Sequence, residues 1–269
     1  MVPTSPRPLP SLRADCRSCV GLCCVAFAFT RSSDFPVDKN AGDPCPNLST
    51  SFSCTVHDSL DSRGFRGCSA FDCFGAGQHV SSRLSGGRTW RDDPSTAASM
   101  FAAFRTVTAL HELLWHLTHA RHRTYDDDLK AAVDVLVSEI TASVDSADPA
   151  ADLEMYRERV RPILDAVSED VRASFRAQGD LVDPILVRYA DLAGRDLRRL
   201  RAVGADLRGA SLLGSDLRGV DMAGCDLLGA DLRGADVRGA DLTDCLFLTR
   251  TQLGSTRLDE RTRLPRWSA

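Results

Sequence analysis

Eight of the ten cysteines in this 269-residue chain lie between positions 16 and 73, and thiolates are the side chains best suited to bind a soft metal ion. No cysteine occurs from residue 74 to residue 224. Cys16 and Cys19 are separated by two residues, so one backbone turn offers both sulfurs to the same ion. Zinc and iron–sulfur clusters are the centres that select such ligands. The candidate ligands are Cys16, Cys19, Cys23, Cys24, Cys45, Cys54, Cys68 and Cys73.

The surrounding segment, residues 15–92, is rich in Gly, Pro, Ser and Asp and shows little regular periodicity. This composition predicts a small loop-rich unit that needs a staple. Disulfides and packed free thiols are the alternatives to metal ligation, and a reducing cytosol favours the metal. Eight thiols suffice for two four-cysteine sites, or for one site with spare thiols such as Cys24, and the spacing does not assign them. His57 and His79 could each replace a cysteine ligand, although a surface position is the simpler interpretation.

Several pieces of this segment resemble a family of Cys-rich zinc- or iron-chelating domains. The resemblance covers residues 16–73 and rests on Cys16-x-x-Cys19-Val20-Gly21-Leu22-Cys23-Cys24, Pro44-Cys45-Pro46-Asn47-Leu48, Cys54-Thr55-Val56-His57, Gly67-Cys68 and Phe71-Asp72-Cys73. It implies a metal-binding unit with the eight cysteines as ligands. Zinc is the expected cofactor, and an iron–sulfur cluster is the alternative.

Hydrophobic periodicity becomes helical over residues 93–180. One helix begins at Pro94 with Asp93 as its cap, and two more follow, one from about Asp127 and one after Asp148. Three amphipathic helices form a small bundle or a layer on their neighbours.

The first of these helices carries four histidines, and histidine is a common zinc ligand. A metalloprotease helix needs two histidines four residues apart on one face. His111 and His116 are five apart, which excludes that motif. His116 and His119 are three apart and could share a ligand, but a solvated helix end is the simpler interpretation.

From residue 190 to residue 247 the sequence repeats every five residues, in a unit that reads Ala-Asp-Leu-Arg-Gly. This period fits neither the helical turn nor the two-residue alternation of a strand. It predicts a chain that turns a corner in every repeat, with Gly at the corner and the central residue on a common axis. The central residues are Leu192, Leu197, Ala202, Leu207, Leu212, Leu217, Met222, Leu227, Leu232, Val237, Leu242 and Phe247.

These repeats resemble the pentapeptide-repeat family, whose consensus is Ala, then Asp or Asn, then Leu and two freer positions. The resemblance implies a right-handed, four-sided β-helix with four repeats per coil over residues 181–249, closed by a C-terminal cap at 250–269. In that stacking, Asp196, Asp216 and Asp236 form one column. The expected protein is a multi-domain α+β chain in which this β-helix follows a Cys-rich loop unit and central helices.

Leucine replaces the outward-facing Arg of the repeat at Leu213, Leu228 and Leu248. Apolar groups on a regular surface mark a contact with another part of the chain or with a partner. We expect these three residues to form an interaction face, which the chain's own helical segment is the simplest candidate to cover.

The chain has a net charge of −4, so no overall basic field draws it to nucleic acid or to a membrane. Its longest apolar run, residues 20–29, is shorter than the ~20 residues of a membrane-spanning helix. Residues 1–14 are rich in proline, lack the apolar core of a signal peptide and predict a flexible tail. We therefore expect a cytoplasmic protein that contacts neither nucleic acid nor membrane directly.

No nucleophile with a base, pair of carboxylates or nucleotide-binding loop stands out, so the sequence does not favour an enzyme. It favours a non-catalytic scaffold that binds another protein and carries a structural metal site. A metal-dependent redox or modifying protein that docks through the repeats is the alternative. The repeat resemblance also implies DNA mimicry and binding of DNA gyrase, but residues 190–247 hold ten Asp and eight Arg, whereas a mimic of the phosphate backbone needs a dense negative surface.

Overall fold

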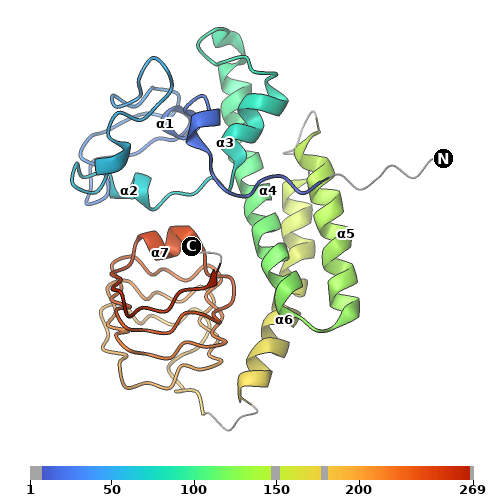
Figure 1. Ribbon diagram of the computed structural model, residues 1–269, viewed down its shortest axis with the longest axis vertical. Helices are drawn as coiled ribbons and strands as arrows, with labels where there is room; N and C mark the ends of the chain where they lie inside the picture. The colour runs from blue at the N-terminus through green and yellow to red at the C-terminus, as the bar shows by residue number, and fades with distance from the viewer. Residues whose placement is uncertain (1–7, 147–151, 177–180, 267–269) are drawn as a thin grey trace, which may run out of the picture. The chain divides into compact units, whose positions relative to one another are not determined.

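The computed structural model describes residues 8–146, 152–176 and 181–266 (Figure 1). The first half of the predicted tail, residues 1–7, lies outside the described residues. The chain divides into two compact units. The N-terminal unit consists of Met1–Thr118 and Lys130–Pro162, and the C-terminal unit consists of His119–Leu129 and Ile163–Ala269.

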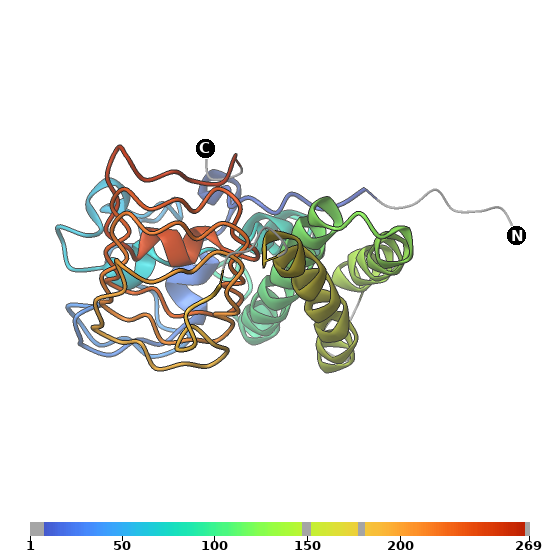
Figure 2. The ribbon, with the colours of Figure 1, turned by 90° about the horizontal axis from the view of Figure 1, so that it is seen from below.

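The N-terminal unit combines short helical turns, joined by loops, with long helices. The short elements are η1 (Cys16–Ser18), α1 (Leu22–Ala26), η2 (His57–Ser59), α2 (Arg66–Ser69), α3 (Ala76–His79), η3 (Val80–Leu84) and η4 (Pro94–Thr96). The long helices are α4 (Ala97–Arg123), α5 (Asp127–Val144) and α6 (Leu153–Arg176), which extend into the C-terminal unit. Within the N-terminal unit they lie side by side (Figures 1 and 2). No helix of the described residues is long and apolar enough to cross a membrane.

The start of α4 follows the predicted capping pattern. Asp93 accepts a hydrogen bond from the backbone N–H of Ser95 at 3.1 Å, and Pro94 takes the first helical position, where an N–H is not needed. Fully buried apolar residues then recur every three or four positions along α4 and supply the core of the unit. They are Phe104, Val107, Leu110, Leu114 and Leu117.

The loops that carry most of the cysteines contain little regular pairing. Two antiparallel bridges join them, from Phe29 to Lys39 and from Leu48 to Cys54. The remaining backbone bonds of this segment are those of turns and loops, so its regular structure is limited to the short helical turns and these two bridges.

The predicted four-sided β-helix is wrong, and so is the α+β class, because the described residues contain no β-strand. Most five-residue repeats contribute one bridge position, usually at the Asp, and then turn; Ser211 and Leu246 take this position in two repeats, and the repeat at Arg201 has no bridge. The corner ends the extended backbone before it reaches the length of a strand. The bridges are parallel and join residues such as Asp196 to Asp216 and Asp216 to Asp236, so the aspartates do form a column.

Backbone hydrogen bonds run in two directions through the repeats. At the corner between consecutive repeats, the N–H of Ala210 closes a turn on the carbonyl of Leu207 at 3.0 Å. Between stacked turns, the N–H of Leu207 donates to the carbonyl of Asp226, and the N–H of Asp226 donates to that of Ala205, both at 3.0 Å. These bonds satisfy the buried backbone without a strand.

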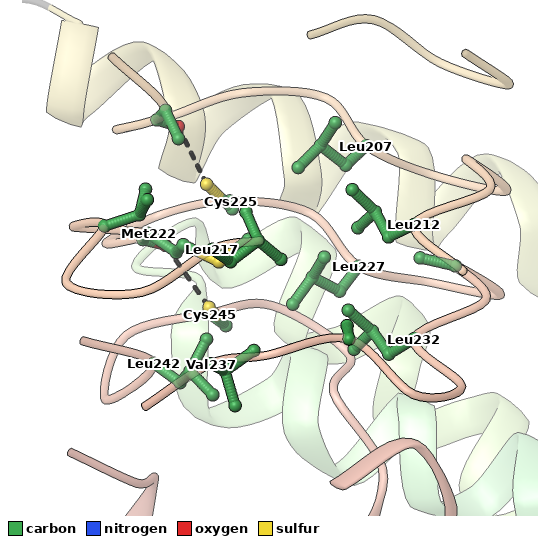
Figure 3. Packing of buried hydrophobic residues seen from close by; sticks show 14 of the residues in the cluster. Leu207, Leu212, Leu217, Met222, Cys225, Leu227, Leu232, Val237, Leu242 and Cys245 are labelled. Carbon is green, nitrogen blue, oxygen red and sulfur yellow. Dashed lines mark hydrogen bonds between the residues drawn. The ribbon is translucent and has the colours of Figure 1, made fainter. Parts of the chain in front are cut away.

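The central residues of the repeats point into the stack and pack on one another (Figure 3). All twelve, from Leu192 to Phe247, are at most 2% exposed. Two cysteines take the small inward position beside them. Their thiols donate to backbone carbonyls, from Cys225 to Ala202 at 2.7 Å and from Cys245 to Met222 at 3.2 Å. These two thiols are therefore part of the apolar core.

Helix α7 (Arg250–Gly254) follows the last repeat and begins with a capping box formed by Thr249 and Gln252. The side chain of Gln252 also donates to the carbonyls of Leu227 and Ala230, at 2.8 and 2.9 Å. Beyond α7, parallel bridges from Arg257 and Arg263 continue the stack. The predicted cap thus adds further turns, and its last residues, 267–269, lie outside the described residues.

The C-terminal half of α6 packs against corner glycines of the repeats. A Cβ atom on Gly224 would lie 2.4 Å from Cδ2 of Phe175, and one on Gly204 would lie 3.1 Å from the carbonyl oxygen of Arg172. Glycine therefore serves both the positive φ of the corner and the close approach of the helix.

Replacing Gly224 by alanine is expected to destabilise the C-terminal unit more than replacing Gly214. Both have positive φ, +68° and +62°, which costs an L-residue about 1–2 kcal/mol. The methyl group at position 224 also meets Phe175, and overpacking adds about 1–3 kcal/mol, whereas a Cβ on Gly214 has no atom within 4 Å. Urea unfolding of the two variants measures the difference. Equal losses would show that the contact with Phe175 does not constrain position 224.

Candidate metal centre

The eight cysteines at positions 16–73 are all free thiols of the N-terminal unit. Cys45 is buried, Cys16 is exposed, and the other six are half-buried. No disulfide joins any two of these described cysteines. The donor set is therefore available to a metal ion in its reduced form.

Helix α3 brings the first cysteines close to Cys73. It packs against η1, which contains Cys16, and Cys73 precedes it by three residues. A Cβ atom on Gly77 of α3 would lie 2.7 Å from the sulfur of Cys19 and 3.8 Å from that of Cys73. Glycine at this position leaves room for both sulfurs.

A second set of contacts ties Cys24 to the loops that follow α1. The N–H of Cys45 donates to the carbonyl of Cys24 at 2.9 Å, and the N–H of Leu48 donates to the carbonyl of Cys45 at 2.9 Å. Leu48 in turn bridges Cys54. The sulfurs of Cys23 and Cys24, adjacent in α1, are 3.9 Å apart.

Backbone N–H groups donate to four of the sulfurs. Burial raises the pKa of these thiols, and the N–H groups act against it by favouring the thiolate. The donors are Leu22 and Gly21 to Cys19, Asn47 to Cys45, Val56 to Cys54, and Gly77 and Gly75 to Cys73. In metal sites, hydrogen bonds of this kind orient the ligands and tune their affinity for the ion.

Burial also raises the pKa of Cys16, and it raises that of Cys68 to about 12. In the adjacent pair of α1, the hydrogen bond from Cys23 lowers the pKa of Cys24 and raises that of Cys23 itself. Most of these thiols are consequently protonated at neutral pH when no cation is bound. A metal ion must displace their protons to bind.

Within the described residues, no three His, Cys, Asp or Glu side chains converge closely enough to hold a metal ion. Free thiols are nevertheless the ligand type that zinc and iron–sulfur clusters select, and eight of them lie in this one loop-rich unit. Binding would require the cysteine side chains to close on the ion.

The histidines lie in other surroundings. His57 is exposed, with Nδ1 3.4 Å from Asp58. His79, predicted at the surface, is instead buried, and its Nε2 lies 3.0 Å from Oδ1 of Asp145. His116, predicted at a solvated helix end, is also buried, because the apolar face of α4 is wide enough to include it.

We expect the stability of the N-terminal unit to depend on pH because of His111. It is fully buried, and its Nδ1 lies 2.7 Å from the carbonyl oxygen of Phe74. Burial lowers its pKa from 6.5 to about 4. The charge of His79 lowers this pKa further, and the charge of Asp145 opposes the shift. As the pH falls, His111 of the unfolded chain, with its pKa near 6.5, takes up a proton before His111 of the folded chain does. The stability of the N-terminal unit that depends on neutral His111 is therefore fully present above pH 6.5 and falls toward pH 4, by up to about 1.4 kcal/mol per pH unit.

Replacing His111 by asparagine, whose amide can still donate to Phe74, should flatten that part of the pH profile. Thermal unfolding of both proteins between these pH values measures the slope. An unchanged slope in the variant would assign the effect to other groups.

The three leucines of the predicted interaction face differ in their surroundings. Leu213 is 44% exposed, Leu228 is half-buried, and Leu248 is fully buried in the apolar core. Of the three, Leu213 therefore offers the largest apolar surface.

Outward Asp and Arg side chains form bidentate pairs on the repeats. Arg198, Arg218 and Arg238 each place Nε and Nη2 on the two carboxylate oxygens of the Asp two residues earlier, at 2.6–2.9 Å. The hydrogen bonds from Arg218 lower the pKa of Asp216, which burial opposes. Together with Arg261, the three arginines line a shallow hollow of about 490 Å³, which we call the arginine face.

One Asp–Arg pair of the repeats is buried. Asp226 is 0% exposed, and its Oδ2 accepts bonds from Nε and Nη2 of Arg208 at 3.1 and 2.5 Å. Arg208 also donates to Asp165 and to the carbonyl of Leu164, both on α6. Sequence reasoning missed this pair, although one signal was present: Leu228 stands where the local Arg partner of Asp226 would be.

Comparison with known proteins bears on the repeats. Residues 188–223 and 214–247 match the family model of pentapeptide repeats, in eight copies. The match does not extend to the Cys-rich segment. The protein thus contains pentapeptide repeats, and the resemblance of residues 16–73 to chelating domains stays a prediction.

Two individual proteins are similar to part of the chain. YybG of Bacillus subtilis (strain 168) is 50% identical over 109 residues, which are 40% of this chain and 39% of YybG. The crystal structure of a pentapeptide repeat protein (Rfr23) from the cyanobacterium Cyanothece 51142 is 30% identical, covers 28% of this chain and 44% of that chain, and has a TM-score of 0.20. The aligned parts are less than half of each protein.

Proposed function

We propose that this protein with pentapeptide repeats is a non-catalytic scaffold, in which a structural zinc site holds the Cys-rich segment and the repeats bind another protein. The observation that carries the metal part is the gathering of eight reduced thiols in one loop-rich unit, four of which accept backbone N–H bonds. Zinc would supply a crosslink in addition to the small apolar core of this segment. Such a site requires a reducing compartment, which supports a cytoplasmic location.

The arginine face supports the binding part of the proposal. Arg198, Arg218 and Arg238 are about half-exposed and are held in fixed directions by their aspartates, whereas Arg261 is 83% exposed. Rigid paired charges favour a protein surface that carries both signs of charge. The arginines do not favour a mimic of DNA, so DNA gyrase is not the partner we propose.

Elemental analysis of protein purified without air, with a visible spectrum of the same sample, tests the metal part. Zinc without colour supports the structural site. Iron with matching sulfide and visible absorption would replace it by the iron–sulfur alternative and favour a redox role. A metal-free, fully folded protein would contradict both.

A photo-crosslinker at Leu213, beside the outward pairs of the repeats, tests the binding part in cells. We expect one dominant crosslinked protein, and its loss when Arg198 and Arg218 are replaced by glutamate. A crosslinker at Tyr125, which is 92% exposed and outside the repeats, is the matched control. The same products from both positions would contradict a specific face. An unchanged supercoiling assay at high protein concentration would exclude gyrase.

A further inference from the structure

We propose that the first end of the repeat stack binds the same end of a second copy of this chain, which gives a symmetric dimer. The surface is formed by residues 181–200, which we call the first layer of the stack. Bridges from Asp191 to Ser211 and from Asp196 to Asp216 join it to the next layer. The contact involves neither the proposed metal site nor the outward arginines as a protein-binding face, so it goes beyond the proposed function.

The core of the repeats is open at the first layer, which lies at the end of the stack opposite α7 (Figure 1). After the last repeat, α7 and further turns continue the stack. In the first layer, however, Ala190 and Leu200 are partly exposed, whereas their counterparts in the next layer, Ala210 and Val220, are at most 3% exposed. A stack of repeats needs a cover at each end, because the last layer cannot bury its own inner face.

The backbone of the first layer has unpaired hydrogen-bonding groups at this end. In the next layer, the N–H of Ser211 donates to the carbonyl of Ala190 at 2.9 Å, and its carbonyl accepts the N–H of Leu192 at 2.8 Å. Asp191 and Asp196 hold the equivalent positions of the first layer, and neither forms a backbone hydrogen bond with any residue that the structure describes. Each of them therefore presents one N–H and one carbonyl at the open end.

Apolar side chains are exposed in the same layer. Leu181, Val187 and Tyr189 are 68%, 51% and 73% exposed. Tyr189 stands at a corner that most later repeats give to glycine, with a φ of +61°, which L side chains rarely adopt. Its ring lies against the corner of the next layer, since a Cβ on Gly209 would be 2.6 Å from its Cδ1. Exposed apolar groups beside an unpaired backbone edge are typical of a surface that a partner covers.

The shape of the edge selects the partner. A corner at Gly194, with a φ of +66°, separates Asp191 from Asp196, so a straight extended segment could pair with only one of them. A chain that turns the same corner can pair with both, and the first layer of a second copy is such a chain.

The unpaired groups are also complementary to themselves. In an antiparallel pair, two opposite residues each donate one N–H and accept one on the carbonyl. Asp191 and Asp196 offer both groups, so Asp191 of one copy can pair with Asp196 of the other, and the reverse pair follows from the two-fold symmetry. Such a contact uses the same surface on both copies and closes as a dimer.

The charges of the first layer suit a second copy as well. Residues 181–200 contain three Asp and four Arg, so two layers meet with little net repulsion. Arg195 is exposed at the open end, where the next two layers have the buried Ser215 and Ala235. In the pairing described above, Arg195 of one copy comes next to Asp191 of the other, which places opposite charges together.

Sedimentation equilibrium of the purified full chain at micromolar concentrations tests the dimer. We expect a reversible equilibrium between one chain and two. Val187→Lys places a charge in the contact and should weaken the association about 10-fold or more. Val135→Lys, at a valine of α5 that is 53% exposed, is the matched control and should keep the wild-type affinity. A monomer at every concentration would overturn the proposal, and so would equal effects of the two substitutions.

Hydrogen exchange of the wild-type protein locates the contact without any variant. The amides of Asp191 and Asp196 should exchange quickly in dilute protein and slowly at concentrations where the dimer forms. Those of Leu207 and Leu212, which are already bonded within the stack, should not change. Concentration-dependent protection confined to residues outside 181–200 would overturn the assignment of this end.

A photo-crosslinker at Tyr189 of the purified protein tests the symmetry. We expect a product of twice the mass of one chain, in which residues 181–200 of both copies are joined. A crosslink from Tyr189 to residues 250–266 of the other copy would indicate a head-to-tail contact and would overturn the symmetric dimer.

Discussion

Replacing Asp226 by alanine is expected to lower the free energy of unfolding of the C-terminal unit by about 3–5 kcal/mol, because it leaves the Arg208 guanidinium buried without its main counter-charge. Asp226 is 0% exposed and accepts two bonds from Arg208, whose own side chain is 7% exposed. Asp165 and the carbonyl of Leu164 remain as partners of Arg208, but both are already used in the native pair. The loss is therefore that of a broken buried ion pair.

Hydrogen exchange of the amides of residues 190–247 measures this loss where it occurs. Asp216→Ala is the matched control, since its partner Arg218 is 42% exposed and water replaces the lost bond, so little change is expected. The double variant Arg208→Met/Asp226→Leu removes both charges and should be closer to wild type than Asp226→Ala alone. Similar losses for Asp226→Ala and Asp216→Ala would contradict the buried pair.

The sequence predicts the interior of the repeats well because a strict period leaves one position facing inward. All twelve central residues, Leu192 and Phe247 included, are buried as an inward position requires. The same period could not predict that strands would be absent. A single bridge residue between two corners satisfies the periodicity and the backbone hydrogen bonds as well as a strand would. The sequence pattern therefore does not distinguish a strand from a turn.

Residues that depend on contacts between distant segments were not predictable. Leu228 shows in the sequence that Asp226 lacks a local Arg, but the partner of Asp226 and the contacts of Arg208 with Asp165 and Leu164 depend on the packing of α6. Lys39 resembles a surface residue in the sequence, and its burial depends on three carbonyls of a loop without periodicity. In both cases the polar partner comes from tertiary packing.

Removing the proposed zinc with a chelator is expected to unfold residues 15–92 while leaving the repeats folded. Structural zinc contributes an apparent 10–16 kcal/mol, roughly, in small domains that fold around it. Without that contribution, the regular structure of the Cys-rich segment consists of short helical turns and two antiparallel bridges. The repeats keep an apolar core of their own, in which Cys225 and Cys245 bond to carbonyls and need no ion.

Hydrogen exchange before and after chelation resolves the two regions. We expect loss of protection over residues 15–92 and unchanged protection over residues 190–247. Acid should have the same effect as the chelator, because burial raises the pKa of Cys16 and Cys68, so protons compete for these sulfurs more strongly as the pH falls. Protection of residues 15–92 that survives chelation would mean that the loops hold together through their side chains alone.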